Sequence, residues 1–520
     1  MSTYRRPRGR GGGGPGAAGS GSGGGRAECA DPDVRVPSIP PEAASASSIG
    51  VRGYGIPKRL LPESVQSRLR RDLTVRPRAP PVGPQPPPYP VYLESVSKIY
   101  VPRYLGVAAY GAPPEDRRPP PEARPGLAFA GSLRASQDEP VQAFLAAARD
   151  PGRMGGVLNM GCASGKTVMA LYAACALGLK TLVVVHKQFL LNQWEERISQ
   201  FVPGAAVGRI QGPVDTSAGA DIVIGMLQSL ATRDYGPSLS SGGFGLLIVD
   251  ECHHTSAEVF SRALARTSFR HSMGLSATIA RKDGLGHVFR WFLGPVVYKS
   301  KREAQAGVEV LRLVAPRAPP GGGGGGGYGS EHFSAGGSLN IARMMTDACK
   351  CSRRSELIAR TVAEFAAVPG RRILVLSERR GPLEELDRMI RSGSGGGVGG
   401  GAPATSGFYV GGMKEADLKE SLECQVILAT YSMASEGFDH PCLNTLVLAT
   451  SRTDIEQSVG RILRQRPEAR EHSPVVVDVV DDFSVFRNQA AKRAKFYSRH
   501  GFSSRSAAQA AAPARLRGPD

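Results

Sequence analysis

The sequence lacks any long run of apolar residues that could cross a bilayer. Its longest apolar stretch, residues 168–179, has 12 residues and ends before Lys180, whereas a membrane-spanning helix needs about 20. The first residues are rich in arginine and glycine and lack the apolar core of a secretory signal. These absences argue against a membrane protein and against a secreted protein, so we expect an intracellular one.

Cysteine is scarce and scattered, with 8 residues among 520 and no CxxC pair. The one close pair is Cys349 and Cys351. Disulfide frameworks and zinc ribbons need regular, paired spacings that this sequence does not have. The pattern therefore predicts a reducing compartment and no structural zinc.

Acidic residues are too few to balance the basic ones, which leaves a net charge of +19. Residues 1–90 hold 14 Lys/Arg against 6 Asp/Glu, and residues 487–520 hold 8 against 1. Most of the excess therefore lies at the two ends, where it favours loose, salt-sensitive attraction to nucleic acid. A solubilising tail or a compositional bias of the genome would give the same charge.

Composition divides the chain into six segments. Glycine and proline, with 65 and 40 residues, concentrate outside two regions in which short apolar runs alternate with amphipathic ones. We expect a disordered basic tail at 1–90, a short ordered element with a proline-rich spacer at 91–125, an α/β domain at 126–300, a glycine-rich linker at 301–345, a second α/β domain at 346–486 and a basic tail at 487–520.

Both central regions have the rhythm of a parallel α/β sheet. Runs such as "KTLVVVHK" and "FGLLIVDE" are typical of buried strands, and "QFLLNQWEERISQFV" between them is an amphipathic helix. Strands that alternate with helices indicate parallel sheets covered on both faces. The predicted fold class is therefore α/β, with two tandem domains built on parallel sheets.

The segment "NMGCASGKT", residues 159–167, has the context of a phosphate-binding loop because it joins a strand to a helix. In such a loop, backbone N–H groups cradle the phosphates, Lys166 reaches the β- and γ-phosphates and Thr167 holds Mg²⁺. Met160 stands where the full pattern has glycine, and Ala163 lies inside the loop. An ordinary turn between a strand and a helix is the alternative.

The segment "GLLIVDECHH" ends a buried strand in two adjacent carboxylates. Asp250 would hold Mg²⁺, and Glu251 would orient and deprotonate the attacking water. A zinc site is the alternative, but adjacent ligands seldom turn onto one ion. We instead expect His253 to couple the nucleotide site to neighbouring elements, and Cys252 to be a small buried residue.

Two further segments, "LSAT" and "QSVGRILR", complete the set. The small residues Ser276, Ala277 and Thr278 could relay the state of a nucleotide through hydrogen bonds. Arg461 and Arg464, three residues apart on a helical face, could reach a γ-phosphate from the second domain. A solvated helix face is the alternative for the two arginines.

In order and spacing, these four segments resemble motifs I, II, III and VI of the superfamily 2 helicases, with "VDECHH" similar to their DExH motif. The resemblance covers residues 91–500 and implies two RecA-like domains that face each other across an ATP cleft. It implies ATP and Mg²⁺ as cofactors and a catalytic role for Gln457. The nucleotide contacts that it implies are Gln137 of "LRASQ" at the adenine, Gly437 and Asp439 of "TYSMASEGFD" near the ribose, and the loop residues Gly161, Cys162, Ala163, Ser164, Gly165, Lys166 and Thr167.

Other segments look like the strand-contacting motifs of the same helicases. "VVVHKQFLLNQW" resembles motif Ia, and "TYSMASEGFD" resembles motif V. Contacts to phosphates rather than to base edges would give little sequence preference. The nucleic-acid candidates are His186, Gln193, Arg281, Thr430 and Ser435.

Finer likenesses point to a branch of the superfamily. "GLSATIARKDGLG" resembles the branch of the TFIIH translocase, in which Arg281, Lys282 and Asp283 would form the R-x-D triplet. "IYVPRYLG", "YVGGMK" and "AKFYSRHGF" resemble helicases of large DNA viruses, whose poxvirus members act in transcript release and late transcription. The resemblance implies movement on DNA rather than RNA, in viral transcription or DNA repair, with the transcription machinery as a candidate partner and the virion or the host-cell replication compartment as the location. A duplex translocase that separates no strands and a non-catalytic nucleic-acid scaffold are the alternatives.

Overall fold

The computed structural model describes most of the chain. The described residues are 36–78, 85–161, 164–252, 257–277, 281, 283–300, 307–315, 328–334, 336–392, 404–435, 438, 440–465 and 467–506. The predicted site residues that lie outside them are Cys162, Ala163, His253, Thr278, Lys282, Gly437 and Asp439, together with the side chain of Ser435. The parts of the predicted tails at 1–35 and 507–520 also lie outside them. No helix within the described ranges is both long and apolar enough to cross a bilayer.

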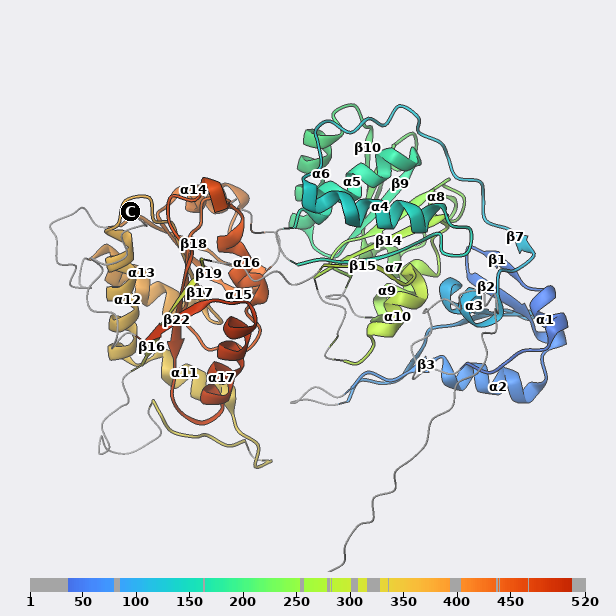
Figure 1. Ribbon diagram of the computed structural model, residues 1–520. Helices are drawn as coiled ribbons and strands as arrows, with labels where there is room; N and C mark the ends of the chain where they lie inside the picture. The colour runs from blue at the N-terminus through green and yellow to red at the C-terminus, as the bar shows by residue number, and fades with distance from the viewer. Residues whose placement is uncertain are drawn as a thin grey trace, which may run out of the picture.

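The first α/β domain is built on an eight-stranded sheet (Figure 1). In spatial order its strands are β11 (Val214–Asp215), β10 (Val207–Gln211), β12 (Ile222–Met226), β9 (Thr181–Val185), β13 (Leu246–Val249), β14 (His271–Ser276), β8 (Gly155–Asn159) and β15 (Val296–Lys299). All neighbours are parallel except the hairpin pair β10 and β11. The parallel order brings the carboxyl ends of β13, β14 and β8 to one edge.

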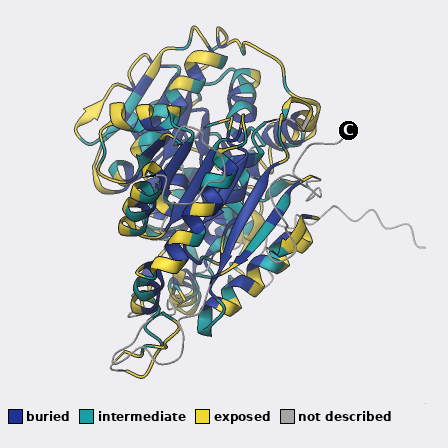
Figure 2. Ribbon diagram, turned by 90° about the vertical axis from the view of Figure 1, so that its left-hand side faces the viewer, coloured by how far each residue is buried: buried dark blue, intermediate teal, exposed yellow. Residues whose placement is uncertain are grey.

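Helices cover both faces of this sheet. The helices are α4 (Ala135–Arg149), α5 (Lys166–Leu177) and α6 (Gln188–Phe201) on one face, and α7 (Leu227–Thr232), α9 (Ala257–Leu264) and α10 (Gly286–Leu293) on the other, with the short α8 at Pro237–Ser240. Strand β9 is buried throughout, and its side chains alternate between the two cores. Figure 2, which views the molecule from the side of the second domain, shows buried strands between helices whose outer faces are exposed.

The second domain has a seven-stranded sheet in which every neighbouring pair is parallel. Its strands in spatial order are β18 (Ser406–Tyr409), β19 (Val426–Thr430), β17 (Ile373–Ser377), β20 (Thr445–Leu448), β21 (Val475–Val480), β16 (Glu309–Val314) and β22 (Ser503–Ser506). The helices are α11 (Ile341–Cys349), α12 (Ser352–Ala366), α13 (Arg380–Arg391), α14 (Glu415–Glu423), α15 (Tyr431–Ser435), α16 (Glu456–Gly460) and α17 (Ser484–Arg499), with the 3₁₀ turns η3 (Arg461–Leu463) and η4 (Pro467–Ala469). The predicted α/β class with two parallel sheets is thus confirmed.

The second sheet takes in residues that composition assigns to a linker and a tail. Strand β16 lies within the predicted linker and pairs with β21, and α17 and β22 lie within the predicted basic tail. The tail prediction is wrong as far as Ser506. The reason is that a basic residue of α17, Arg493, is buried and bonds Asp478 at 2.9 Å, so its charge is internal to the fold.

The prediction of a disordered tail at 1–90 is wrong from residue 36 onward. The described residues between 36 and 118 form the N-terminal unit, whose sheet has the order β5-β6-β2-β1-β7. Its elements are α1 (Pro41–Ser45), β1 (Ser48–Gly50), β2 (Gly53–Pro57), η1 (Lys58–Leu60), α2 (Glu63–Asp72), β3 (Thr74–Val75), β4 (Tyr89–Pro90), β5 (Leu93–Glu94), β6 (Lys98–Val101), α3 (Arg103–Tyr110) and β7 (Glu115–Asp116). Short apolar runs such as the one around Ile56 are buried in a core shared with the first domain. Average composition cannot detect burial that depends on residues far away in the sequence.

Candidate nucleotide site

Three parallel strands deliver the predicted catalytic residues to one edge of the first sheet. Strand β14 lies between β13 and β8, and Ser276 at the end of β14 is paired in register with Asn159 at the end of β8. The backbone N–H of Met160 donates to the carbonyl of Ser276 at 2.9 Å. The loops after β8, β13 and β14 therefore start side by side.

The loop after β8 needs a glycine immediately before helix α5. Gly165 has φ +78°, and a Cβ there would lie 2.2 Å from Nε2 of Gln137. That amide donates to the carbonyl of Ser164 at 3.0 Å, and the Ser164 hydroxyl donates to the carbonyl of Gly161 at 2.9 Å. Gln137, which is predicted to contact adenine, thus supports the loop after β8. A left-handed glycine before a helix N-terminus leaves backbone N–H groups free to face a phosphate.

Lys166 is the first residue of α5, and its side chain is buried. Its ammonium nitrogen lies 3.3 Å from the carbonyl oxygen of Met160, 3.4 Å from that of Gly161 and 3.4 Å from Oε1 of Glu251. The ammonium group of Lys166 is therefore surrounded by oxygen atoms where the loop after β8 meets α5. Phosphate oxygens offer the same kind of partner with more negative charge, so the residues fit a nucleoside triphosphate.

Asp250 is buried at the end of β13. Its Oδ2 accepts a hydrogen bond from the indole N–H of Trp194 at 2.9 Å, and its Oδ1 accepts one from the N–H of Glu251 at 2.9 Å. Burial, together with the negative charge of Glu251, raises the pKa of the Asp250 carboxyl to about 6. A cation beside Asp250 would favour the ionised form of this carboxyl.

The oxygen ligands available here fit Mg²⁺. Asp250 and Thr167 would contribute a carboxylate and a hydroxyl, and Mg²⁺ commonly takes only one or two carboxylates and completes its shell with water and substrate phosphates. Within the described ranges, no three or more His, Cys, Asp and Glu side chains form a metal cluster. Burial raises the pKa of the Cys252 thiol to about 12, so this residue is a protonated, buried side chain beside the hydroxyl of Ser276.

Glu251 has a strained backbone. Its φ is +46°, a left-handed conformation that residues other than glycine adopt at a cost of about 1–3 kcal/mol. The turn redirects the chain immediately after β13 and leaves the Glu251 carboxylate beside Lys166. Strain retained at a point where two charged side chains meet is typical of functional sites.

In the second domain, Arg461 and Arg464 converge on one backbone carbonyl. Nη1 of Arg461 donates to the carbonyl of Phe438 at 2.5 Å, and Nη2 of Arg464 donates to the same oxygen at 3.0 Å. Phe438 is buried within the segment that resembles motif V. Gln457 lies on α16, one helical turn before Arg461. The two guanidinium groups thus lie together beside the Phe438 carbonyl.

The nucleic-acid candidates lie in different settings. The carbonyl of His186, after β9, accepts from Nε2 of Gln228 at 2.9 Å, Gln193 is half-buried on α6, and the Thr430 hydroxyl lies 3.2 Å from that of Ser432. Arg281 differs, because its guanidinium binds Asp283 at 2.9 and 2.6 Å and lies over the ring of Phe289. We therefore assign Arg281 first to the shape of its own loop.

Sequence reasoning missed Trp194, which donates directly to Asp250. The signal was a tryptophan on the buried face of the helix that follows β9, a strand paired with β13. A buried indole N–H usually finds a hydrogen-bond partner. The nearest predicted carboxylate could therefore have been tested as that partner.

The chain matches a family model and several known proteins. Residues 130–281 match the model described as "Type III restriction enzyme, res subunit". The protein named "Putative ATP-dependent RNA helicase L396" of Acanthamoeba polyphaga mimivirus is 32% identical over 458 residues, which is 86% of this chain and 85% of the relative. The protein named "DNA 3'-5' translocase XPB2" of Sulfurisphaera tokodaii is 32% identical over 175 residues, 34% of this chain and 37% of the relative.

Solved structures also align with the chain. The crystal structure of T4 UvsW aligns with a TM-score of 0.33 at 14% identity, over 88% of this chain and 99% of that one. Dbp5 of S. cerevisiae, bound to RNA and ADP BeF3, aligns with a TM-score of 0.46 at 9% identity, over 72% and 94%.

Proposed function

Because this chain belongs to the superfamily 2 helicases, we propose that it uses the Lys166, Asp250 and Glu251 site to drive movement along DNA. The family makes it an ATP-hydrolysing helicase with two RecA-like domains. The observation that carries the site assignment is the meeting of these residues, from two strands, at one sheet edge. The site, the DNA track and the biological role are the parts that we propose.

Hydrolysis would begin with binding of the triphosphate at the N-terminus of α5. Backbone N–H groups of the loop around Gly165 and the ammonium of Lys166 would bind phosphate oxygens. Thr167 and Asp250 would hold Mg²⁺, which neutralises charge on the transferred phosphoryl group when bound. Once Lys166 turns to phosphate, Glu251 is released to accept a proton from the attacking water.

The second domain would complete the site. Arg461 and Arg464 would move from the Phe438 carbonyl to the γ-phosphate, as arginine fingers do. Gln457 would support them from α16, while Gly437 and Asp439 would lie near the ribose. The state of the nucleotide would be transmitted to the bound nucleic acid by Ser276, Ala277, Thr278 and His253.

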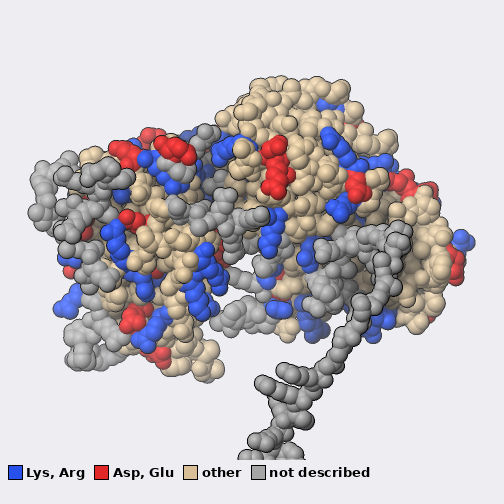
Figure 3. Space-filling view, in the orientation of Figure 1, with Lys and Arg blue, Asp and Glu red and all other residues tan. Residues whose placement is uncertain are grey.

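The nucleic acid would be bound through its phosphates. Figure 3 shows Lys and Arg side chains at several places over both domains, which suits contact with a polyanion. His186, Gln193, Thr430 and Ser435 are the proposed strand contacts. The R-x-D triplet and the relative named as a DNA translocase support DNA, and the relative named as an RNA helicase makes RNA the alternative.

The biological setting is proposed from the relatives. Besides the mimivirus protein, they include proteins named as helicases in Invertebrate iridescent virus 6 and African swine fever virus. We infer a role in viral transcript release or DNA repair, with the transcription machinery as the partner. The virion or the host-cell replication compartment is then the location.

ATP hydrolysis with different polymers tests this proposal. Wild-type protein should hydrolyse ATP faster with DNA than with RNA, and Lys166→Ala should remove that activity. Stimulation by RNA alone would overturn the DNA assignment, and full activity in Lys166→Ala would overturn the site. Strand-displacement and triplex-displacement assays would separate a helicase from a duplex translocase. An absence of turnover with every polymer would favour a non-catalytic scaffold.

A further inference from the structure

We propose that the N-terminal unit positions strand β14 for the ATPase cycle, with Arg103, Tyr104 and Arg118 as the positioning residues. The unit contacts the start of this strand and Asp283 beyond its end, and the last residue of the strand, Ser276, adjoins the nucleotide site. The inference rests on the proposed function, because it needs Ser276 to act between the nucleotide and the track. It adds a regulatory role for a part of the chain outside the two helicase domains.

Two guanidinium groups bind the segment that leads into β14. Nη1 of Arg103 donates to the carbonyls of Phe269 and Arg270 at 3.1 and 3.0 Å. Nη1 of Arg118 donates to the same two carbonyls at 3.0 and 3.2 Å. Arg118 is fixed in turn by Asp116 at 2.7 Å. Two buried cations on the same pair of carbonyls hold this backbone far more firmly than a surface contact would.

Tyr104 binds the strand itself. Its hydroxyl lies 2.5 Å from Oγ of Ser272 and 3.1 Å from the carbonyl of Met154, just before β8. Oγ of Ser272 lies 2.9 Å from the carbonyl oxygen of Leu293, at the end of α10, to which its single O–H can donate. Ser272 is fully buried. One hydroxyl pair therefore joins α3 of the N-terminal unit to β14, β8 and α10.

The N-terminal unit also binds the loop that follows the strand. The backbone N–H of Arg78 donates to the carbonyl of Asp283 at 3.0 Å. Asp283 holds Arg281 and also accepts the N–H of Leu285 at 3.0 Å. Arg281 and Asp283 are therefore held beside α10 by contacts that include the N-terminal unit.

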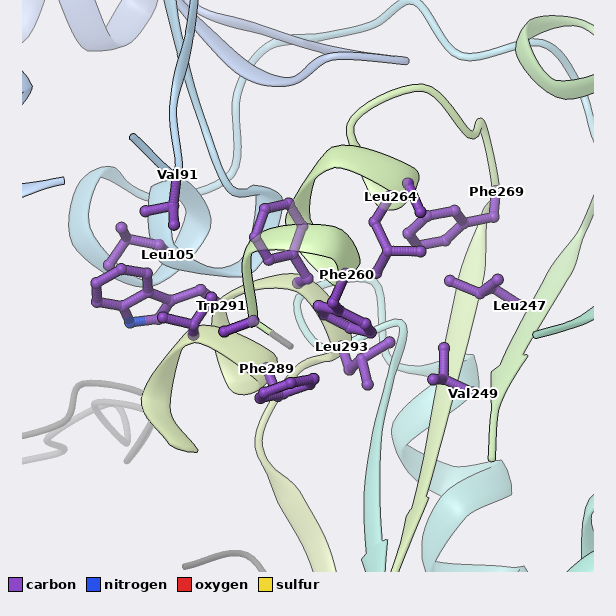
Figure 4. Packing of buried hydrophobic residues seen from close by; sticks show 14 of the residues in the cluster. Val91, Leu105, Leu247, Val249, Phe260, Leu264, Phe269, Phe289, Trp291 and Leu293 are labelled. Carbon is purple, nitrogen blue, oxygen red and sulfur yellow. The ribbon is translucent and has the colours of Figure 1, made fainter. Parts of the chain in front are cut away.

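Apolar packing makes the unit and the first domain one body. A single core cluster contains side chains from α3 and β6 together with side chains from β13, α9 and α10. Figure 4 shows Val91 and Leu105 of the N-terminal unit beside the indole of Trp291 on α10. A packed interior transmits displacements instead of absorbing them. A shift of α3 would therefore be passed to β14.

The polar contacts are costly for a purely structural joint. Arg103 is buried, and its hydrogen bonds in the described part of the chain go to carbonyls and hydroxyls. Burial lowers the pKa of its guanidinium to about 10. Apolar side chains would join two bodies at less cost, whereas buried polar contacts fix one relative position. Strand β14 is about 17 Å long. Fixing its first residues would therefore fix the position of Ser276 at its other end.

Two tyrosines on the same helix provide a matched test in the full-length protein. Tyr104→Phe removes the hydroxyl that contacts β14, and Tyr110→Phe removes one that donates to Pro37 within the N-terminal unit at 3.0 Å. Basal and polymer-stimulated ATPase would be measured as kcat and as KM for ATP. The polymer is whichever of single-stranded DNA, duplex DNA or RNA stimulates wild-type protein most. Amide hydrogen exchange over residues 271–276 provides a readout that needs no turnover.

We expect Tyr104→Phe to lower the ratio of stimulated to basal kcat by about fivefold, with the KM for ATP unchanged and faster exchange in β14. Tyr110→Phe should leave the ratio and the exchange as in wild-type. Adding Ser272→Ala to Tyr104→Phe should cause a smaller loss than Ser272→Ala causes in wild-type protein, because the two changes share the Tyr104 contact and differ in the bond from Ser272 to the Leu293 carbonyl. Equal ratios and equal exchange in the two tyrosine variants would overturn the positioning role.

The design separates this inference from the proposed function. If wild-type protein shows no stimulated turnover, or Lys166→Ala retains it, the proposed function fails. Amide hydrogen exchange over residues 271–276 still tests the contact between Tyr104 and Ser272. Slower or unchanged exchange in Tyr104→Phe would overturn the positioning role, whatever the ATPase result.

Discussion

The ammonium nitrogen of Lys166 lies 3.4 Å from Oε1 of Glu251. One residue begins the helix after β8 and the other follows β13, two strands away in the sheet. Without nucleotide, the proposed phosphate ligand and the proposed base neutralise each other. A bound triphosphate would replace Glu251 as the partner of Lys166. The Glu251 carboxylate would then be available as a base only when the substrate is present.

Trp194→Phe should impair the site through Asp250. The change removes the indole N–H donor and leaves a buried carboxylate with one partner fewer, which costs about 1–3 kcal/mol of unfolding free energy. Because this donor stabilises the ionised carboxyl, its loss should raise the pKa of Asp250 further. The acid limb of the pH–rate profile should then move to higher pH.

The second tryptophan of the chain provides the control for this experiment. Trp291→Phe changes a buried indole on α10, in a different core cluster from Trp194. It should destabilise the protein without moving the acid limb. A profile that moves equally in both variants would contradict the role of Trp194.

Arg461→Ala and Arg464→Ala should each lower kcat by about 10³-fold or more, as loss of an arginine finger does, with a much smaller change in ATP affinity. The measurement is steady-state ATPase beside binding of a non-hydrolysable ATP analogue. Arg470→Ala is the control, because Arg470 donates to the Gln465 carbonyl nearby. Loss of analogue binding equal to the loss of kcat would assign the arginines to ground-state binding.

The sequence predicted the strand ends well because parallel strands place their carboxyl ends together. Lys166, Asp250 and Ser276 needed only this rule and their motifs. Trp194 and the contact between Tyr104 and Ser272 could not be derived in that way, because they depend on which helix covers which strand. The N-terminal unit was missed for a related reason, since Tyr54 and Leu69 are buried by residues distant in sequence.

Arg493→Ala should unfold the second domain more easily. Arg493 and Asp478 form a buried pair at 2.8 Å that joins α17 to β21, and breaking such a pair costs about 3–5 kcal/mol. Arg487→Ala on the same helix breaks a more exposed pair with Asp482 and should cost less than about 1 kcal/mol. Urea unfolding of both variants measures the difference. Equal midpoints would contradict the structural role of α17.

His271 should make stability depend on pH. Burial and the nearby charges of Arg103, Arg118 and Arg270 lower the pKa of His271 from 6.5 to about 4. The unfolded chain therefore binds more protons than the folded chain between these values, so stability is full above pH 6.5 and falls as pH drops toward 4. The loss is at most about 3 kcal/mol.

Urea unfolding from pH 7 to pH 4 in wild-type and His271→Gln protein isolates this contribution. The variant should show a flatter dependence in that window. A curve of unchanged slope would mean that His271 titrates normally.

The most direct test of the central claim is ATP hydrolysis by Glu251→Gln with single-stranded DNA, duplex DNA and RNA. The account predicts turnover reduced at least about 100-fold, the range of general base catalysis, with ATP analogue binding retained. Glu258→Gln, which removes a carboxylate that pairs with Arg262 at 2.6 Å on α9, should behave as wild-type. Normal turnover in Glu251→Gln would show that the carboxylate beside Lys166 is not the base.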